Sequence, residues 1–347
     1  MSRLGYRGAM KAALAAMAGV AIVAGLLTPA AAQVAGWDKV VTDAKAEGGL
    51  VLYTALVGAP STKAIAKAFE AKYGIPVQLL EARASELRER IRTEQTAGRF
   101  LGDVMFNSDN QAIVLNAEDK SLMPHGDVPN AKALTGQFKD NGLSAPVMTI
   151  NYGLLINTKL VPPNEEPKSW RDLTDPKWKG KILSDDMRAV GGGYVMFFVT
   201  LEKLGKDFHD RLATQNLQFT REMREAGRRV ARSEMAIYVP FILGDIKYLK
   251  GLPVKALVPS EGAPYVQYSA AVLKNAPHPN AAKLFTDFMM SDEVQKIYAV
   301  DGYGIVRPGV LETLSPEERA ISDVKLMGGS DPMKQNEMLD LAKSIYK

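Results

Sequence analysis

The sequence predicts an α/β protein with two hinged lobes that are joined by extended crossover strands. Three observations predict this class. The 347 residues suit one large or two medium domains. Hydrophobic residues make up 46% and charged residues 24% of the chain, which is typical of a soluble globular protein. Short apolar strands alternate with helices, and two long extended stretches, near residues 147–157 and 260–273, connect the two units.

The first unit has the order strand, helix, strand, helix, strand. Its strands are expected at residues 50–53, 77–80 and 103–106. The first helix opens at Pro60 and ends at Gly74, with apolar residues every four positions on one face. Ser85 is expected to cap the second helix, which stops near Gly98. The short links indicate a parallel sheet with helices on its faces.

The second unit continues this alternation. Further strands are expected at residues 182–184, 235–239 and 254–258, and helices at residues 194–204, 220–232 and 240–250. A second extended stretch, residues 266–273, precedes helices at residues 279–290 and 291–300. Ser315 and Glu318 form a capping box for the next helix, and the last helix starts at Asp331. The predicted lobes are residues 38–146 plus 263–310, and residues 147–262 plus 311–347.

Residues 1–32 are predicted to be an export signal. Three cations precede an uncharged apolar run at residues 12–27, and three small residues offer a cleavage site after about Ala32. The alternative is a membrane anchor, but this run is shorter than the roughly 18–20 apolar residues that span a bilayer. We therefore expect a periplasmic protein. Because the leader holds three Lys and Arg and no Asp or Glu, its removal takes the formal charge from +4 to near neutral. We expect no nucleic-acid partner.

Several kinds of chemistry are disfavoured by what the sequence lacks. Cysteine is absent, and the three histidines, His125, His209 and His278, are far apart. The sequence has no glycine-rich nucleotide-binding motif, no zinc-protease motif and no nucleophile elbow. We therefore predict no catalytic residues, no metal site and no enzyme activity, although a secreted enzyme on the same fold stays an alternative.

Several segments together resemble the periplasmic solute-binding proteins of ABC importers, in the branch usually called ferric-iron or spermidine/putrescine-like. The most telling are SWRDLTDPKWKGK, within residues 168–182, and PHPNAAKLFTDF, within residues 276–290. Further similar segments are LVLYTA at residues 50–55, FEAKYGIPV at 69–77, YGLLINT at 152–158 and VARSEMAIY at 230–238. The resemblance implies the type II two-lobe periplasmic binding fold. It also implies a monomer that captures a small molecule or ion between its lobes and delivers it to an inner-membrane permease with its ATPase. A receptor for a sensor kinase is another alternative.

The residues at the strand ends depart from the iron-binding members of this family. Those members commonly use an adjacent tyrosine pair, a histidine after the first strand and an acid after the third. This chain has no Tyr-Tyr pair and no histidine after Tyr53, and only Asp109 could serve as the acid. Ferric ion favours several hard anionic oxygens. We therefore expect no cofactor. Binding of a ferric ion is the disfavoured alternative, and it would rely on Tyr238, Tyr265 or Tyr268.

Glycines and hydroxyls at the strand ends favour a small organic anion, such as a carboxylate, phosphonate or phosphate ester. Ser61 and Thr62 open one predicted helix and the glycines at 191–193 another, and free N–H groups at helix starts hold anions. Arg188 and Arg221 could add bidentate contacts. The alternatives without ligand binding are a tight turn for the glycines and surface ion pairs for the arginines. The predicted ligand-binding residues are Thr54, Ser61, Thr62, Ser108, Asp109, Arg188, Gly192, Gly193, Tyr194, Arg221, Tyr238 and Tyr265.

Overall fold

A computed structural model describes residues 29–134 and 136–347 of the chain. Most of the predicted leader, residues 1–28, lies outside the described residues. Helix α1, Pro29–Glu47, begins inside the predicted cleavage region and was not predicted. The residues from Lys39 onward form one compact unit. Within the described ranges, no helix is both long and apolar enough to cross a lipid bilayer.

A mixed sheet forms the frame of this unit. Its strand order is β2-β1-β3-β9-β4-β7-β5-β6, with β8 and β10 added beside β4 and β11 beside β9. The strands are β1 Leu50–Thr54, β2 Val77–Glu81, β3 Val104–Ser108, β4 Ala145–Asn157, β5 Ile182–Asp185, β6 Gln218–Thr220, β7 Ile237–Ile242, β8 Val254–Leu257, β9 Ala263–Val272, β10 Gly304–Ile305 and β11 Leu326–Gly328. Strands β1, β2 and β3 are parallel, as predicted.

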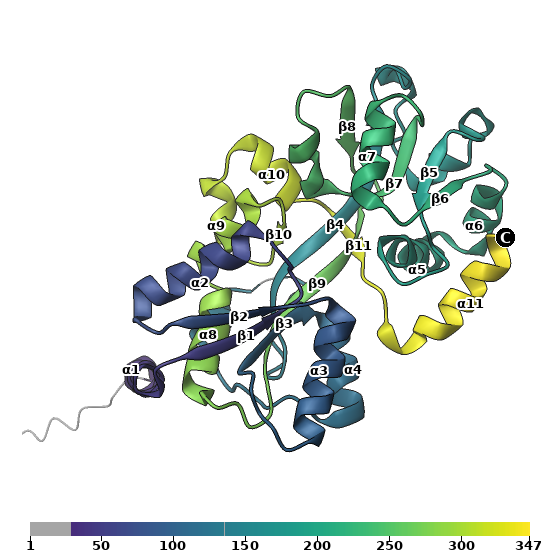
Figure 1. The fold of residues 1–347 in the computed structure, drawn as a ribbon. Coiled ribbons are helices and arrows are strands. Elements are labelled where there is room, and N and C mark those ends of the chain that lie inside the picture. The colour runs from purple at the N-terminus through teal and green to yellow at the C-terminus, as the bar shows by residue number, and fades with distance from the viewer. Residues whose placement is uncertain (1–28, 135) are drawn as a thin grey trace, which may run out of the picture. The chain divides into compact units, whose positions relative to one another are not determined.

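Two long strands connect the two halves of the sheet (Figure 1). The first part of β4 pairs with β9, and its second part pairs with β7 and β8. Strand β9 pairs on its other side with β3. These are the two extended crossings that the sequence predicted, so the predicted α/β class with two connected halves is confirmed. The lobe boundaries given above stay a prediction.

Helices cover both halves of the sheet. Their bounds are α2 Pro60–Tyr73, α3 Ala84–Thr96, α4 Asp109–Asp119, α5 Gly192–Leu204, α6 Lys206–Ala213, α7 Met223–Ala231, α8 Pro279–Met289, α9 Asp292–Val300, α10 Pro316–Ser322 and α11 Gln335–Ile345. Figure 1 shows α2, α3, α4 and α8 around the β1–β3 strands, and α5, α6 and α7 around β5–β7. Neither α4 nor α6 was predicted.

Three local predictions were wrong. Helix α3 starts at Ala84, before Ser85, because the Arg83 N–H is held by the Glu86 carboxylate at 3.2 Å. Thr220 ends strand β6 instead of capping a helix, and α7 begins only at Met223. Residues 240–250 are not one helix. Strand β7 continues to Ile242 between β4 and β5, and the 3-10 helix η5, Leu243–Leu249, follows.

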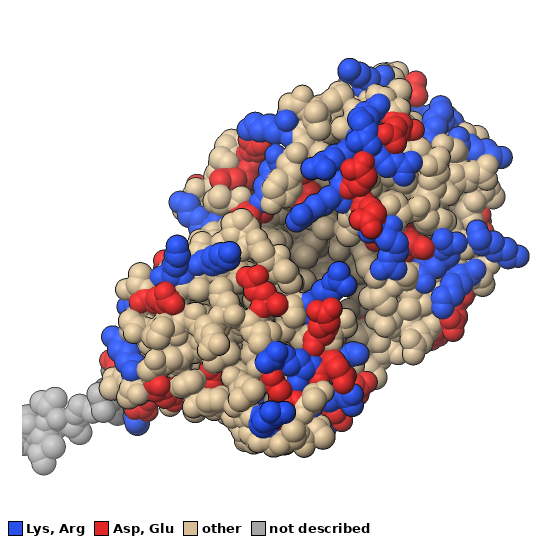
Figure 2. Space-filling view, viewed as in Figure 1, with Lys and Arg blue, Asp and Glu red and all other residues tan. Residues whose placement is uncertain are grey.

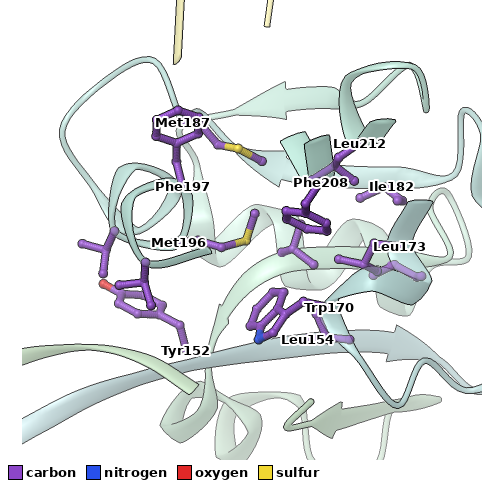
Figure 3. Close-up of a cluster of buried hydrophobic side chains, with 14 of the residues drawn as sticks. Tyr152, Leu154, Trp170, Leu173, Ile182, Met187, Met196, Phe197, Phe208 and Leu212 are labelled. Atoms are coloured by element: carbon purple, nitrogen blue, oxygen red, sulfur yellow. The ribbon is translucent and has the colours of Figure 1, made fainter. Parts of the chain in front are cut away.

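The core of the second half packs around Trp170 (Figure 3). The Trp170 side chain is fully buried, and its indole N–H donates to the Gly262 carbonyl at 2.9 Å. Phe197 and Phe208, from α5 and α6, belong to the same cluster. This core is a rigid support for the loops that follow β4, β5 and β7, because closely packed interiors deform little.

Candidate functional site

Loops from both halves of the sheet enclose a cavity of about 440 Å³. Its lining residues are Ala55, Leu56, Val57, Gly58, Ala59, Pro60, Arg83, Ala84, Arg224, Ile242, Gly244, Asp245, Lys247, Tyr248, Tyr268, Asp301, Gly302 and Tyr303. A second cavity of about 330 Å³ shares Gly58, Pro60, Arg224, Asp245 and Tyr248 with the first. We call these two cavities together the cleft site. Figure 2 shows a hollow flanked by charges of both signs where Figure 1 places β4 and β9.

The loop between β1 and α2 forms one wall of the cleft site and is fixed by side chains. The Leu56 N–H donates to the Thr54 hydroxyl at 3.2 Å. The Gly58 N–H donates to Glu81 Oε2 at 2.9 Å, which ties the loop to the end of β2. Pro60, the first residue of α2, lines both cavities, so the N-terminal end of this helix borders the site. A helix start carries partial positive charge.

The opposite wall combines η5 with the turn after α9. A Cβ atom on Gly244 would lie 2.2 Å from the Gly302 carbonyl oxygen, so only glycine permits this approach of two backbones. The Lys247 ammonium donates to the Asp301 carboxylate at 2.5 Å and to the Asp301 carbonyl at 2.6 Å. This ion pair uses the charges of both side chains, so neither is free for a ligand in this state.

Four other charged side chains line the cleft site without an ion pair among the described residues: Arg83, Arg224, Arg228 and Asp245. Burial raises the pKa of the Asp245 carboxyl, while the nearby Arg224 and Lys247 act in the opposite direction. Arginine is the side chain best suited to a planar or tetrahedral anion, because its fork of N–H groups can donate two parallel hydrogen bonds. The unpaired arginines therefore indicate an anionic group in the ligand.

Tyrosines complete the wall. Tyr248 is exposed, with 62% of its surface accessible, whereas Tyr268 and Tyr303 are set deeper. Burial raises the pKa of Tyr268 to about 12. Burial, with a smaller effect of Asp301, also raises the pKa of Tyr303. The Tyr268 and Tyr303 phenols are therefore protonated at neutral pH and can donate hydrogen bonds. The rings of all three tyrosines offer apolar and cation-binding faces.

The predicted residues of the β1–α2 region lie beside the cleft site instead of in its wall. Thr54 is fully buried, and its hydroxyl accepts the loop hydrogen bond from Leu56. Ser61 and Thr62 lie in the first turn of α2, as predicted, and both hydroxyls are buried without a partner among the described residues. Their role in binding stays a prediction.

Two predicted residues line a different cavity. Asp109 and Tyr265 border a space of about 320 Å³ beside α4 and the segment before α11. The Asp109 carboxylate accepts the Ser144 hydroxyl at 2.5 Å. Ser108 ends β3 and pairs in register with Tyr268. Successive residues of a strand point alternately to its two faces, and Tyr265 and Tyr268 of β9 are three positions apart. Their side chains therefore lie on opposite faces and line different cavities.

The predicted anion site at the start of α5 already holds a carboxylate. The Gly193 N–H donates to Asp185 Oδ2 at 2.7 Å, and Asp185 itself is buried. Gly192 and Gly193 are needed for space, because a Cβ on Gly193 would lie 2.5 Å from the Asp185 carbonyl oxygen. Tyr194 is buried in the core, and burial raises its pKa to about 12. The alternative of a tight turn therefore accounts for the close packing here, and ligand binding by Gly192, Gly193 and Tyr194 stays a prediction.

The two predicted arginines of this half have partners. Arg188 pairs with Asp186, its Nε lying 2.8 Å from the carboxylate. Arg221 donates to the Val190 carbonyl at 3.2 Å. Tyr238 is buried, with its hydroxyl unpartnered among the described residues. Of the twelve residues predicted to bind the ligand, none lines the cleft site.

Several residues of the cleft site were missed by sequence reasoning. Arg83 follows the end of β2 almost directly, so the rule that ligands bind at the carboxyl ends of strands could have found it. Asp245 and Lys247 were assigned to a helix and not considered. No sequence pattern marks Tyr303 as a cleft residue, because only the folded chain brings the turn after α9 to the cleft site.

The fold and the cleft define a two-part binding protein, and comparisons with known proteins give its class. A family model described as bacterial extracellular solute-binding protein matches residues 64–327. The chain therefore belongs to this family, and the resemblance found in the sequence is confirmed.

Similar proteins bind different solutes. An uncharacterized protein of Haemophilus influenzae is 28% identical over 269 residues, which cover 73% of this chain and 76% of the relative. The structure of iron-bound HitA from Pseudomonas aeruginosa has a TM-score of 0.68 at 24% identity, over 86% of this chain and 99% of that one. AfuA from Actinobacillus pleuropneumoniae, with fructose-6-phosphate bound, has a TM-score of 0.62 at 25% identity, over 86% and 96%.

Proposed function

We propose that this protein is the periplasmic solute-binding component of an ABC importer. It captures a small organic anion in the cleft site and delivers it to an inner-membrane permease that works with an ATPase. The observation that carries the choice of an anion is the pair of arginines, Arg83 and Arg224, which line the cavity without an ion pair among the described residues. No covalent step is part of this function.

Residues from both halves of the protein line the cleft site, so a bound ligand would contact both halves. Arg83 and the start of α2 belong to the β1–β3 half, whereas Arg224 belongs to α7 in the other half. A ligand that contacts both halves favours the state in which they approach each other, by as much as its affinity for the two states differs. The permease would bind this closed, ligand-loaded state. The fructose-6-phosphate held by AfuA supports a phosphate ester as one candidate ligand.

The test is a binding screen with small carboxylates, phosphonates and phosphate esters, read by thermal shift and then by titration calorimetry. We expect at least one to stabilise the protein, and Arg224→Gln to weaken its binding at least tenfold. Arg229→Gln is the matched control, because Arg229 lies on the same helix but pairs with Glu234. Binding that is unchanged in Arg224→Gln would contradict the proposal.

A ferric ion is the second candidate. Tyr268, Tyr303 and Asp245 line the same cavity and could supply hard oxygen ligands. The three cations in the wall, Lys247 included, count against an isolated trivalent ion. Ferric citrate should produce a visible phenolate-to-iron absorption band if iron binds there, and Tyr303→Phe should remove it. The absence of a band, with citrate alone as the reference, excludes this candidate.

A further inference from the structure

The cleft site contains two opposite charges that do not neutralise each other. Arg224, in the first turn of α7, and Asp245, in η5, both line the two cavities of the site. They form no ion pair within 4.0 Å, although the field of Arg224 reaches the Asp245 carboxyl. Both groups therefore face the same space, and a small molecule can lie between them.

No side chain of the described residues satisfies Asp245. The one ammonium nearby, that of Lys247, is engaged by the Asp301 carboxylate and carbonyl. The hydrogen bonds in the described part of the chain include none to the Asp245 carboxylate, and Asp245 is partly buried. A carboxylate in a cavity wall without a donor is costly, because it loses water and gains no partner. A donor on the ligand would remove this cost.

Aromatic rings surround the same position. Tyr248, Tyr268 and Tyr303 line the cavity together with Asp245. The face of an aromatic ring attracts an organic cation, more strongly where water is excluded. The Lys247 ammonium already lies 5.1 Å from the centre of the Tyr248 ring. A carboxylate among tyrosine rings is the environment that an ammonium group prefers, whereas it repels a simple anion.

We propose that the ligand of the cleft site is a zwitterion, a small molecule with a phosphate, phosphonate or carboxylate at one end and an ammonium group at the other. Arg224, assisted by Arg83, binds the anionic end, and Asp245 with the tyrosine rings binds the cationic end. This assignment rests on the proposed function and narrows it. A simple anion would leave Asp245 unpaired, and a simple cation would leave Arg224 unpaired. A cavity of about 440 Å³ suits a ligand of this kind.

Matched pairs of compounds test the assignment in the full chain. The pairs are 2-aminoethylphosphonate with ethylphosphonate, phosphoethanolamine with ethyl phosphate, and β-alanine with propionate, each titrated calorimetrically at pH 7. We expect at least one amine-bearing compound to bind tenfold or more tightly than its amine-free partner.

The variant Asp245→Asn keeps the size of the side chain and removes its charge. It should abolish this preference by weakening the amine-bearing compound at least tenfold, while the amine-free anion binds as well as before or better. The control Asp119→Asn, at an exposed position of α4, should leave both affinities within twofold.

The possible failures are distinguishable. Equal binding of both members of every pair to the wild type would overturn the zwitterion and leave the organic-anion function standing. A preference for the amine that survives in Asp245→Asn would also overturn the assignment. If no compound of either kind binds, both the zwitterion and the organic anion are wrong, and the ferric test decides.

Discussion

The contact between Gly244 and Gly302 offers a direct test of how the cleft wall is built. In Gly244→Ala, the new Cβ would lie 2.2 Å from the Gly302 carbonyl oxygen, 2.9 Å from its carbon and 3.1 Å from its Cα. All three atoms belong to backbone, so no side chain can rotate away. The two segments must separate by about 1 Å to restore normal contact. Overpacking of this kind costs about 1–3 kcal/mol. For a chain of this size, we expect a loss of roughly 1.5–5 °C in Tm.

The same displacement should reach the binding site, because the Lys247–Asp301 ion pair lies beside this contact. We therefore expect Gly244→Ala to weaken ligand binding as well as stability. Thermal unfolding followed by circular dichroism measures the first effect, and calorimetric titration with the best ligand of the screen measures the second. Gly309→Ala is the control, since its Cβ would meet nothing within 4 Å. A Gly244→Ala protein that melts with the wild type and binds equally well would refute the reasoning.

The remaining predictions concern the core of the second half. Trp170→Phe removes the buried hydrogen bond to Gly262 and should cost about 1–3 kcal/mol in chemical denaturation. Tyr346→Phe removes the 2.6 Å hydrogen bond to His209 Nδ1, and we expect a similar loss. Burial lowers the pKa of His209 to about 3 from 6.5, so the folded state keeps the ring neutral while the unfolded chain takes up a proton. Stability from this group is present above pH 6.5 and is lost as the pH falls towards 3. A His209→Gln variant should show a shallower acid dependence in denaturant titrations between these values.

Local signals predicted some elements well. The capping box of Ser315 and Glu318 starts α10 as expected, and Pro60 and Gly74 delimit α2. These signals work because the groups that satisfy a helix end lie within a few residues of it. Strand β7 shows the opposite case. Pro240 suggested a helix start, but pairing with β4 and β5 holds the chain extended to Ile242. Such pairing depends on residues far away in the sequence and overrides local preference.

The cleft site was only partly predictable for the same reason. The strand-end rule pointed to the loop after β1, and this loop borders the cavity. The residues that complete the wall come from η5, α7 and the turn after α9, which are separated by tens of residues. Nothing local marks Tyr303 or Asp245 as neighbours. Only the crossing of β4 and β9 brings these segments together (Figure 1).

The arginines show what the structure adds to an inference about ligand charge. The sequence favoured Arg188, which lies near a predicted loop or helix start, and did not single out Arg224. In the structure, Arg188 pairs with Asp186, whereas Arg224 lines the cavity without an ion pair among the described residues. A charge that is already paired gains little from a ligand, because binding would exchange one partner for another. An unpaired charge in a cavity wall exchanges only water for the ligand, so it keeps more of the interaction. The residues that select a ligand are therefore best sought among charges left unpaired by the fold, and here these are of both signs.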